Sequence, residues 1–263
     1  MNLGLKDKTA LVAASSRGLG KAIALQFSRE GTHVAICSRN ERDLFKAKKD
    51  IEERTGGLVI AQVADVTNRA SVKKLVEFVT DEFSTLEILI CNAGGPPSGL
   101  VKDFGPEDYL KALELNLLST VNLCYEAIPH MKKQKWGRIV NLTSVSAKQP
   151  IDNLILSNTS RAGVLGFSKS LSNQMAPFGI TVNSVCPGYT KTERVKALAK
   201  AYEESGKGDA QDFFRAIERS IPMGRFGRPY EIASAVVFLC SEAASYITGV
   251  ALQVDGGYIK SNF

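Results

Sequence analysis

The 263-residue sequence has no apolar run of the roughly 20 residues that a membrane span needs. Its five cysteines stand singly, and none forms the Cys-x-x-Cys pair of a zinc or redox motif. Two of them, Cys37 and Cys91, lie in apolar runs, where a free thiol behaves as a small hydrophobic side chain. We therefore expect a cytoplasmic protein without a membrane segment, because unpaired cysteines suit a reducing compartment.

Histidine and clustered positive charge are also scarce. Only two histidines occur, His33 and His130, and neither has the spacing of a metal ligand, so no metal site is expected. The net charge is +6, but cations and acids are mixed, as in residues 46–54. A nucleic-acid-binding surface gathers its positive charge beside aromatic side chains, and no such stripe occurs. The expected partner is therefore a small molecule.

Short apolar runs alternate with longer helical segments along the chain. The runs are residues 9–14, 33–37, 58–63, 86–91, 138–142, 180–185 and 251–254, and helices are expected over 21–29 and 71–83. Continuous apolar runs are typical of parallel strands buried on both faces. Strand–helix alternation predicts an α/β fold, a single-domain Rossmann-type doubly wound parallel sheet over residues 1–263.

Residues 190–228 interrupt the alternation. The segment is charged, contains Gly206 and Gly208, and includes helical pieces such as residues 212–219. It follows a strand, and sheets of this kind bind ligands beyond the carboxyl ends of their strands. We expect a lid insertion over a substrate; the alternative is an ordinary pair of surface helices.

A glycine-containing turn joins the first strand to the first helix. Glycines there let the backbone approach a pyrophosphate, and the helix N-terminus supplies N–H groups and partial positive charge. Ala14 opens the turn, and alanine suits that position only if no positive φ is required. The expected cofactor-binding residues of this turn are Ala14, Ser16, Arg17, Gly18, Leu19 and Gly20.

The second strand is followed by a cation rather than an acid. An NAD-preferring site places a carboxylate here, against the ribose hydroxyls. This chain has Ser38 and Arg39, and Arg39 together with Arg17 can pair with a 2′-phosphate. The sequence therefore favours NADP(H) over NAD.

Other turns resemble those of the short-chain dehydrogenases/reductases, and the resemblance covers nearly the whole chain. Within that family the chain looks most like the β-ketoacyl-acyl-carrier-protein reductase group. The C-terminal stretches 247–249 and 254–257 resemble the family signature. The resemblance implies further cofactor-binding roles for Asp65, Val66, Asn92, Ala93, Gly94, Pro187, Gly188 and Thr192.

The resemblance also implies where the catalytic residues lie. Asn116 matches the family's water-holding asparagine, and Ser144 matches the serine that bonds the substrate carbonyl. The family's tyrosine and lysine correspond to Ser157 and Arg161. Residues at i and i+4 share one helix face, so both side chains should point into the cleft.

This pair changes the expected chemistry. In the family, lysine lowers the pKa of a phenol that starts at about 10. A serine hydroxyl is a weaker acid than a phenol, and its side chain is shorter. Arginine stays protonated, although Arg161 can still bind a ribose or a carboxylate. Tyr189 follows the Pro-Gly turn and is a candidate replacement acid; its alternative role is a packing aromatic.

Three functions remain open from the sequence. The first is an NADP(H)-dependent oxidoreductase acting on a small carbonyl compound or an acyl thioester. The second is a cofactor-binding protein with little catalysis, and the third is a lyase or isomerase in which Arg161 grips an acidic substrate. The resemblance further implies a homotetramer or homodimer in which residues 247–258 meet a neighbouring subunit.

Overall fold

Seven strands build one parallel sheet at the centre of the molecule. The computed structural model describes residues 2–204, 206 and 208–261. The strands lie in the order β3-β2-β1-β4-β5-β6-β7, with parallel neighbours throughout. Their bounds are Thr9–Val12 (β1), His33–Ser38 (β2), Val59–Val63 (β3), Ile88–Cys91 (β4), Gly137–Leu142 (β5), Ile180–Pro187 (β6) and Ala251–Val254 (β7). The order reverses between β1 and β4, as in a doubly wound sheet.

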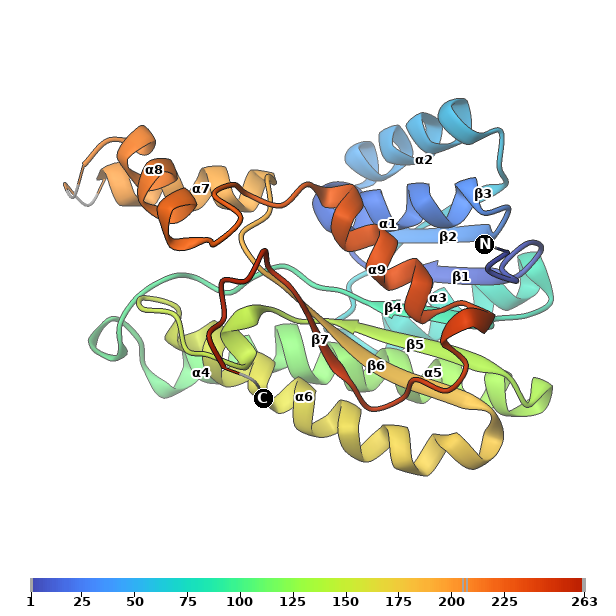
Figure 1. Cartoon of the computed structure of the whole chain (residues 1–263). Helices are drawn as coiled ribbons and strands as arrows, with labels where there is room; N and C mark the ends of the chain where they lie inside the picture. The colour runs from blue at the N-terminus through green and yellow to red at the C-terminus, as the bar shows by residue number, and fades with distance from the viewer. Residues whose placement is uncertain (1, 205, 207, 262–263) are drawn as a thin grey trace.

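Helices cover both faces of the sheet (Figure 1). One face carries α1 (Gly18–Arg29), α2 (Glu41–Thr55) and α9 (Pro229–Leu239). The other carries α3 (Arg69–Phe83), α5 (Ser119–Gln134) and α6 (Ile155–Met175). The shorter α4 (Pro106–Leu113) continues into α5 through a π-helical turn, Glu114–Leu118. The predicted α/β fold with a doubly wound parallel sheet is confirmed.

The central strands are buried on both faces because each contributes to two cores. Ala10 and Val12 of β1 pack in the core beneath α1 and α9. Leu11, whose side chain points the other way, packs in the core with α3 and α5. All three residues are fully buried. This two-sided burial explains why the strands appear in the sequence as continuous apolar runs.

The described part of residues 190–228 contains a helix pair, α7 (Glu193–Glu204) and α8 (Ala210–Ser220), that projects from one end of the molecule (Figure 1). Tyr202 of α7 contacts Phe213 of α8, with ring centroids 5.6 Å apart. Phe214 contacts the buried Phe226 at 5.6 Å. Aromatic contacts therefore hold the two helices together and attach them to the body.

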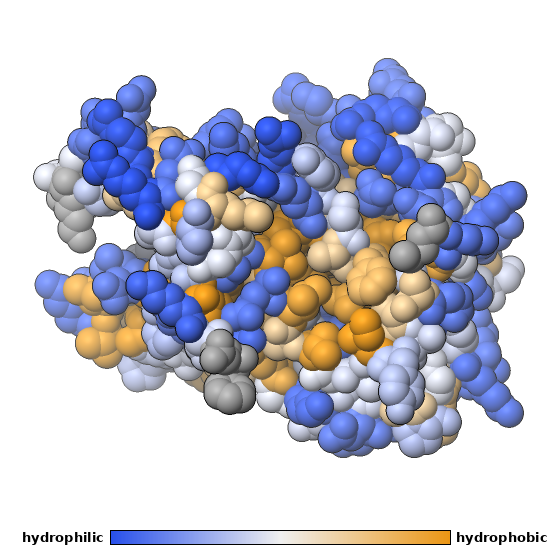
Figure 2. All heavy atoms as spheres, in the orientation of Figure 1, coloured by the Kyte–Doolittle hydropathy of each residue, from blue (hydrophilic) through white to orange (hydrophobic). Residues whose placement is uncertain are grey.

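The last strand, β7, forms one edge of the sheet and lies near exposed apolar side chains. Tyr246, Val250 and Leu252 are all exposed. Figure 2 shows apolar side chains gathered on the face around α9 and β7.

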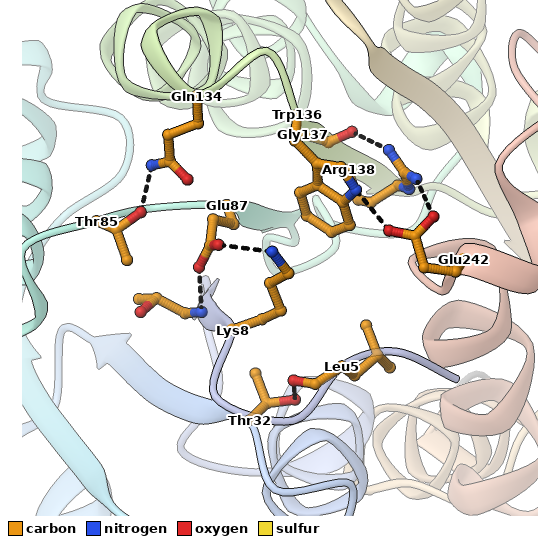
Figure 3. A network of polar contacts seen from close by, with 11 residues as sticks. Leu5, Lys8, Thr32, Thr85, Glu87, Gln134, Trp136, Gly137, Arg138 and Glu242 are labelled. Carbon is orange, nitrogen blue, oxygen red and sulfur yellow. Dashed lines mark hydrogen bonds and ion pairs between the residues drawn. The ribbon is translucent and has the colours of Figure 1, made fainter. Parts of the chain in front are cut away.

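A polar network lies at the amino ends of the central strands of the sheet (Figure 3). Arg138, only 3% exposed, lies against the ring of Trp136 and pairs with Glu242 at 3.6 Å. Trp136 donates its indole N–H to the same carboxylate at 2.7 Å. Just before β1 and β4, Lys8 pairs with Glu87 at 3.0 Å. Glu242 opens a short helical turn after α9, so the network joins early and late parts of the chain.

The described residues contain neither a membrane-spanning helix nor a cluster of metal ligands. None of their helices is long and apolar enough to cross a membrane. Within the same residues, no group of three or more His, Cys, Asp or Glu side chains is arranged to hold a metal ion.

Candidate active site

A cleft of about 1060 Å³ runs along the carboxyl ends of the strands, roofed at one end by α7. The turns after β1 to β6 all contribute to its walls. The lining includes every predicted cofactor residue except Gly20, and every predicted catalytic residue except Asn116. The strand ends meet here because all strands are parallel, which is why sequence positions far apart converge on one site.

The N-terminus of α1 forms part of the cleft wall. No side chain caps this helix, and its first turn holds no acidic residue, whereas Asn40 caps α2 and Asn68 caps α3. Ser16, Arg17, Gly18 and Leu19 line the cleft, as predicted. The uncapped N–H groups and the helix dipole therefore present a site for an anion.

Gly20 lies apart from the other residues of this turn. It is buried and lies outside the cleft lining. A Cβ atom there would lie 2.5 Å from the Ala14 carbonyl oxygen and 2.9 Å from Nδ2 of Asn92. Gly20 therefore allows α1 to pack closely on the two turns.

Alanine was expected to suit position 14 only without a positive φ, and Ala14 has a positive φ. Its φ is +46°, in the left-handed region that favours glycine. This backbone conformation ends β1 at Val12, two residues before the predicted strand end. Asn92 holds the turn by donating from Nδ2 to the carbonyls of Ala13 and Ala14, each at 3.2 Å. The methyl group of Ala14 is thus accommodated at the cost of backbone strain.

Cations line the cleft beyond the end of β2. Arg17 and Arg39 are both exposed and both contribute to the lining, together with Ser38. Asp43, at the start of α2, also lines this end and was not predicted. Asp65 and Val66 follow β3, and Asp65 accepts hydrogen bonds from the backbone N–H and hydroxyl of Thr67.

At the other end of the cleft, Arg161 joins the ends of two strands. Its Nη1 donates to the carbonyls of Thr143 at 2.9 Å and Leu142 at 3.3 Å, after β5. Its Nη2 lies 3.5 Å from the carbonyl of Gly94, after β4. Arg161 and Ser157 both line the cleft, so the shared helix face predicted from their spacing is present.

Asn116 lies behind this wall and not in it. The residue is 4% exposed, and its Nδ2 donates to the Gly94 carbonyl at 3.0 Å. Its Oδ1 accepts from the Ser160 hydroxyl at 3.0 Å. Asn116 therefore helps to fix the same carbonyl that Arg161 approaches.

Three serines meet near the carbonyl-binding position expected from the sequence. Ser144 and Ser157 line the cleft. The Ser157 hydroxyl lies 3.3 Å from the hydroxyl of Ser146, and the backbone N–H of Ser146 donates to Oγ of Ser144 at 3.1 Å. Ser146 was missed because nothing in the sequence distinguishes it within a short helical turn, Val145–Ala147.

Tyr189 lines the cleft but is also part of an aromatic cluster. Its ring lies edge-on to Tyr258 at 5.3 Å and to Phe226 at 6.2 Å. Burial, and then the neighbouring Tyr258, raise the pKa of Tyr189 above its usual value. The packing role is therefore present, and burial in the cluster makes the phenol a weaker acid.

The remaining wall around the serines is mostly apolar. Pro187, Gly188 and Thr192 lie where they were predicted, and a Cβ on Gly188 would lie 2.7 Å from Asp255. Apolar residues of this wall that were not predicted are Leu115, Val145, Ile151, Leu154, Val195, Ala197 and Leu198. In sequence they resemble any core residue, because only the packed fold separates a cleft wall from a buried core.

Comparisons with known proteins agree with this architecture. A family model described as Enoyl-(Acyl carrier protein) reductase matches residues 13–259. The chain is 33% identical over 257 residues to the 3-oxoacyl-[acyl-carrier-protein] reductase FabG of Aquifex aeolicus, covering 98% of this chain and 99% of the relative. The corresponding FabG of Rickettsia bellii is 35% identical with the same coverage.

Solved structures are similar over almost the full chain. The L-sorbose reductase of Gluconobacter frateurii, complexed with NADPH and L-sorbose, has a TM-score of 0.94 at 32% identity, covering 99% of this chain and 100% of its own. A variant of actinorhodin polyketide ketoreductase with NADPH has a TM-score of 0.93 at 30% identity, covering 97% and 98% respectively. The chain therefore belongs to the short-chain dehydrogenase/reductase family, in the group that the Enoyl-(Acyl carrier protein) reductase model describes.

Proposed function

We propose that this protein is an NADP(H)-dependent oxidoreductase of the 3-oxoacyl-(acyl-carrier-protein) reductase type. It interconverts a carbonyl and a hydroxyl group on a small molecule or an acyl thioester. The supporting observation is one continuous cleft that joins the cationic end at Arg17 and Arg39 to the hydroxyls of Ser144 and Ser157. The relatives are named as reductases of this type, and two similar structures contain NADPH.

The chain's residues fit a phosphorylated dinucleotide. The uncapped N–H groups of α1 suit the pyrophosphate, and Gly18 lines the cleft there without a side chain. Arg17 and Arg39 supply positive charge for a 2′-phosphate, opposed in part by Asp43. When bound, the nicotinamide supplies or accepts the hydride.

At the reactive end, Ser157 and Arg161 occupy the positions of the family's tyrosine and lysine. Arg161 keeps its proton and is bonded to backbone carbonyls, so in this proposal it holds the wall of the site and relays no proton. Ser144 and Ser157 donate hydrogen bonds to the substrate oxygen. The proton comes from Tyr189 or from water.

A second candidate function is cofactor binding with little catalysis. The contacts of Arg161 with Thr143 and Leu142 favour it, because they give this cation a structural task. A lyase or isomerase reaction is the third alternative, and it differs from the others in its products.

Two measurements separate these functions. Fluorescence titration gives the dissociation constants of NADPH and NADH, and turnover is then measured on simple ketones, β-ketoesters, acyl thioesters and polyols. Oxidation of NADPH with formation of an alcohol supports the reductase. Binding without turnover supports the second function, and product formation without net cofactor change supports the third.

The proposal also covers the helix pair beside the cleft, the oligomeric state and the cellular location. We propose that α7 and α8 act as a lid, since α7 residues line the cleft. We propose a homodimer or homotetramer, supported by the exposed apolar side chains around β7 (Figure 2). A cytoplasmic location agrees with five free, buried cysteines.

A further inference from the structure

Ser146 contacts both hydroxyl side chains at the reactive end of the cleft while remaining outside it. Ser146 is 2% exposed and does not line the cleft, whereas Ser157 does. Their hydroxyl oxygens are 3.3 Å apart. The backbone N–H of Ser146 bonds Oγ of Ser144 at 3.1 Å.

Burial decides the direction of the bond between the two hydroxyls. Either oxygen is placed to donate. If Ser157 donated, the hydroxyl hydrogen of Ser146 would be left without an acceptor among the described residues, and burying an unpaired donor is costly. If Ser146 donates, its hydrogen is satisfied, and the hydrogen of Ser157 is free to turn into the cleft. The second arrangement is therefore favoured.

The hydrogen bond from the backbone N–H of Ser146 has the same effect on Ser144: it leaves the Ser144 hydroxyl free to donate. Oγ of Ser144 accepts from the N–H of Ser146, so its own hydrogen remains available as a donor. Both cleft-lining serines thus have an acceptor position filled by Ser146. Two O–H donors then face the space where the proposed function places the substrate oxygen.

We propose that Ser146 is a positioning residue that aims the hydroxyls of Ser144 and Ser157 at the substrate oxygen. This inference rests on the proposed reductase function. Preorganised donors stabilise negative charge as it develops on the oxygen during hydride transfer. Ser146 touches neither substrate nor cofactor and acts through its two neighbours.

Ser146→Ala tests the hydroxyl contribution alone, because it keeps the backbone N–H that bonds Ser144. We expect kcat to fall about tenfold, because Ser146 acts indirectly and the loss should match the net worth of one ordinary hydrogen bond. The Kd for NADPH and the Tm should stay near wild type. The primary isotope effect with NADPH deuterated at C4 should rise, because hydride transfer becomes more rate-limiting. Ser146→Thr should restore much of the rate.

Two further variants control the experiment. Ser170→Ala removes a hydroxyl on the exposed face of α6, where it bonds the Gly166 carbonyl at 3.0 Å, and should leave kcat unchanged. Ser146→Cys, with its weak donor, should reproduce the loss in case the alanine variant is unstable.

In a Ser157→Ala background, Ser146→Ala should cause little further loss, because its target is gone. Equal losses in both backgrounds, or a wild-type kcat in Ser146→Ala, would overturn the inference while leaving the reductase function intact. A wild type that binds NADPH but reduces no substrate overturns both.

Discussion

Ala14 holds a left-handed backbone conformation that glycine adopts at lower cost. Ala14→Gly should therefore raise the free energy of unfolding by about 0.5–1 kcal/mol, measured by urea denaturation. The matched control is Ala22→Gly within α1, which should lower it by about 1 kcal/mol because glycine weakens a helix interior. Equal destabilisation by both changes would contradict the strain at position 14.

Arg39 determines cofactor preference at the end of β2 in our proposal. We expect NADPH to bind at least about tenfold tighter than NADH, which is about 1.4 kcal/mol, modest for a charge-assisted pair with the 2′-phosphate. Arg39→Asp should shift the preference toward NADH in fluorescence titrations. Arg42→Asp makes the same charge change on α2 outside the cleft lining and should leave the ratio unchanged. Equal affinities in the wild type would rule out the phosphate clamp.

At the scale of elements, α6 carries the residues that set the chemistry. Ser157 and Arg161 lie one turn apart on the cleft side of this helix. We expect the double change Ser157→Tyr with Arg161→Lys to raise NADPH-dependent reduction of a simple β-ketoester by about tenfold or more, because it restores a phenol beside a lysine. Each single change should do much less, because the lysine acts through the pKa of the tyrosine.

Ser170→Tyr, on the exposed face of α6, controls for adding a phenol to this helix. A double variant that binds NADPH but remains inactive would show that the cleft has diverged beyond this pair. If the wild type is already fast and Ser157→Ala leaves the rate unchanged, the acid lies elsewhere, and Tyr189→Phe is the next measurement.

At the scale of the whole molecule, the two ends of the strands have separate functions. The carboxyl ends of the strands form the cleft, and the amino ends carry the network around Arg138 (Figure 3). Burial lowers the pKa of Arg138, and the nearby charge of Glu242 opposes that shift. This network therefore contributes stability at a distance from the chemistry.

Glu242→Gln should lower the free energy of unfolding by about 1–2 kcal/mol, because the buried Arg138 loses its counter-charge while Trp136 keeps an acceptor. The affinity for NADPH should be unchanged. Glu204→Gln, which breaks the exposed pair with Lys200 on α7, should have no measurable effect in the same urea titration. Equal stability of wild type and Glu242→Gln would show that the charge of Glu242 adds no net stability to the fold.

Local patterns were enough to predict the sheet and most of the cleft. Apolar runs such as residues 138–142 identify buried strands, and parallel strands bring their following turns to one edge. Arg39 was assigned to the cleft from its place after the second strand, whereas Asn92 and Gly188 were assigned from the family resemblance. All three line the cleft.

Other features depend on contacts between distant parts of the chain, and only the tertiary structure decided them. The positive φ of Ala14 is held by Asn92, and Gly20 is required by the closeness of the same two turns. Asn116 lies behind the cleft wall, and Ser146 reaches Ser157 on α6. A residue's type and its neighbours in sequence carry no record of such distances, because they arise only when separate elements pack together.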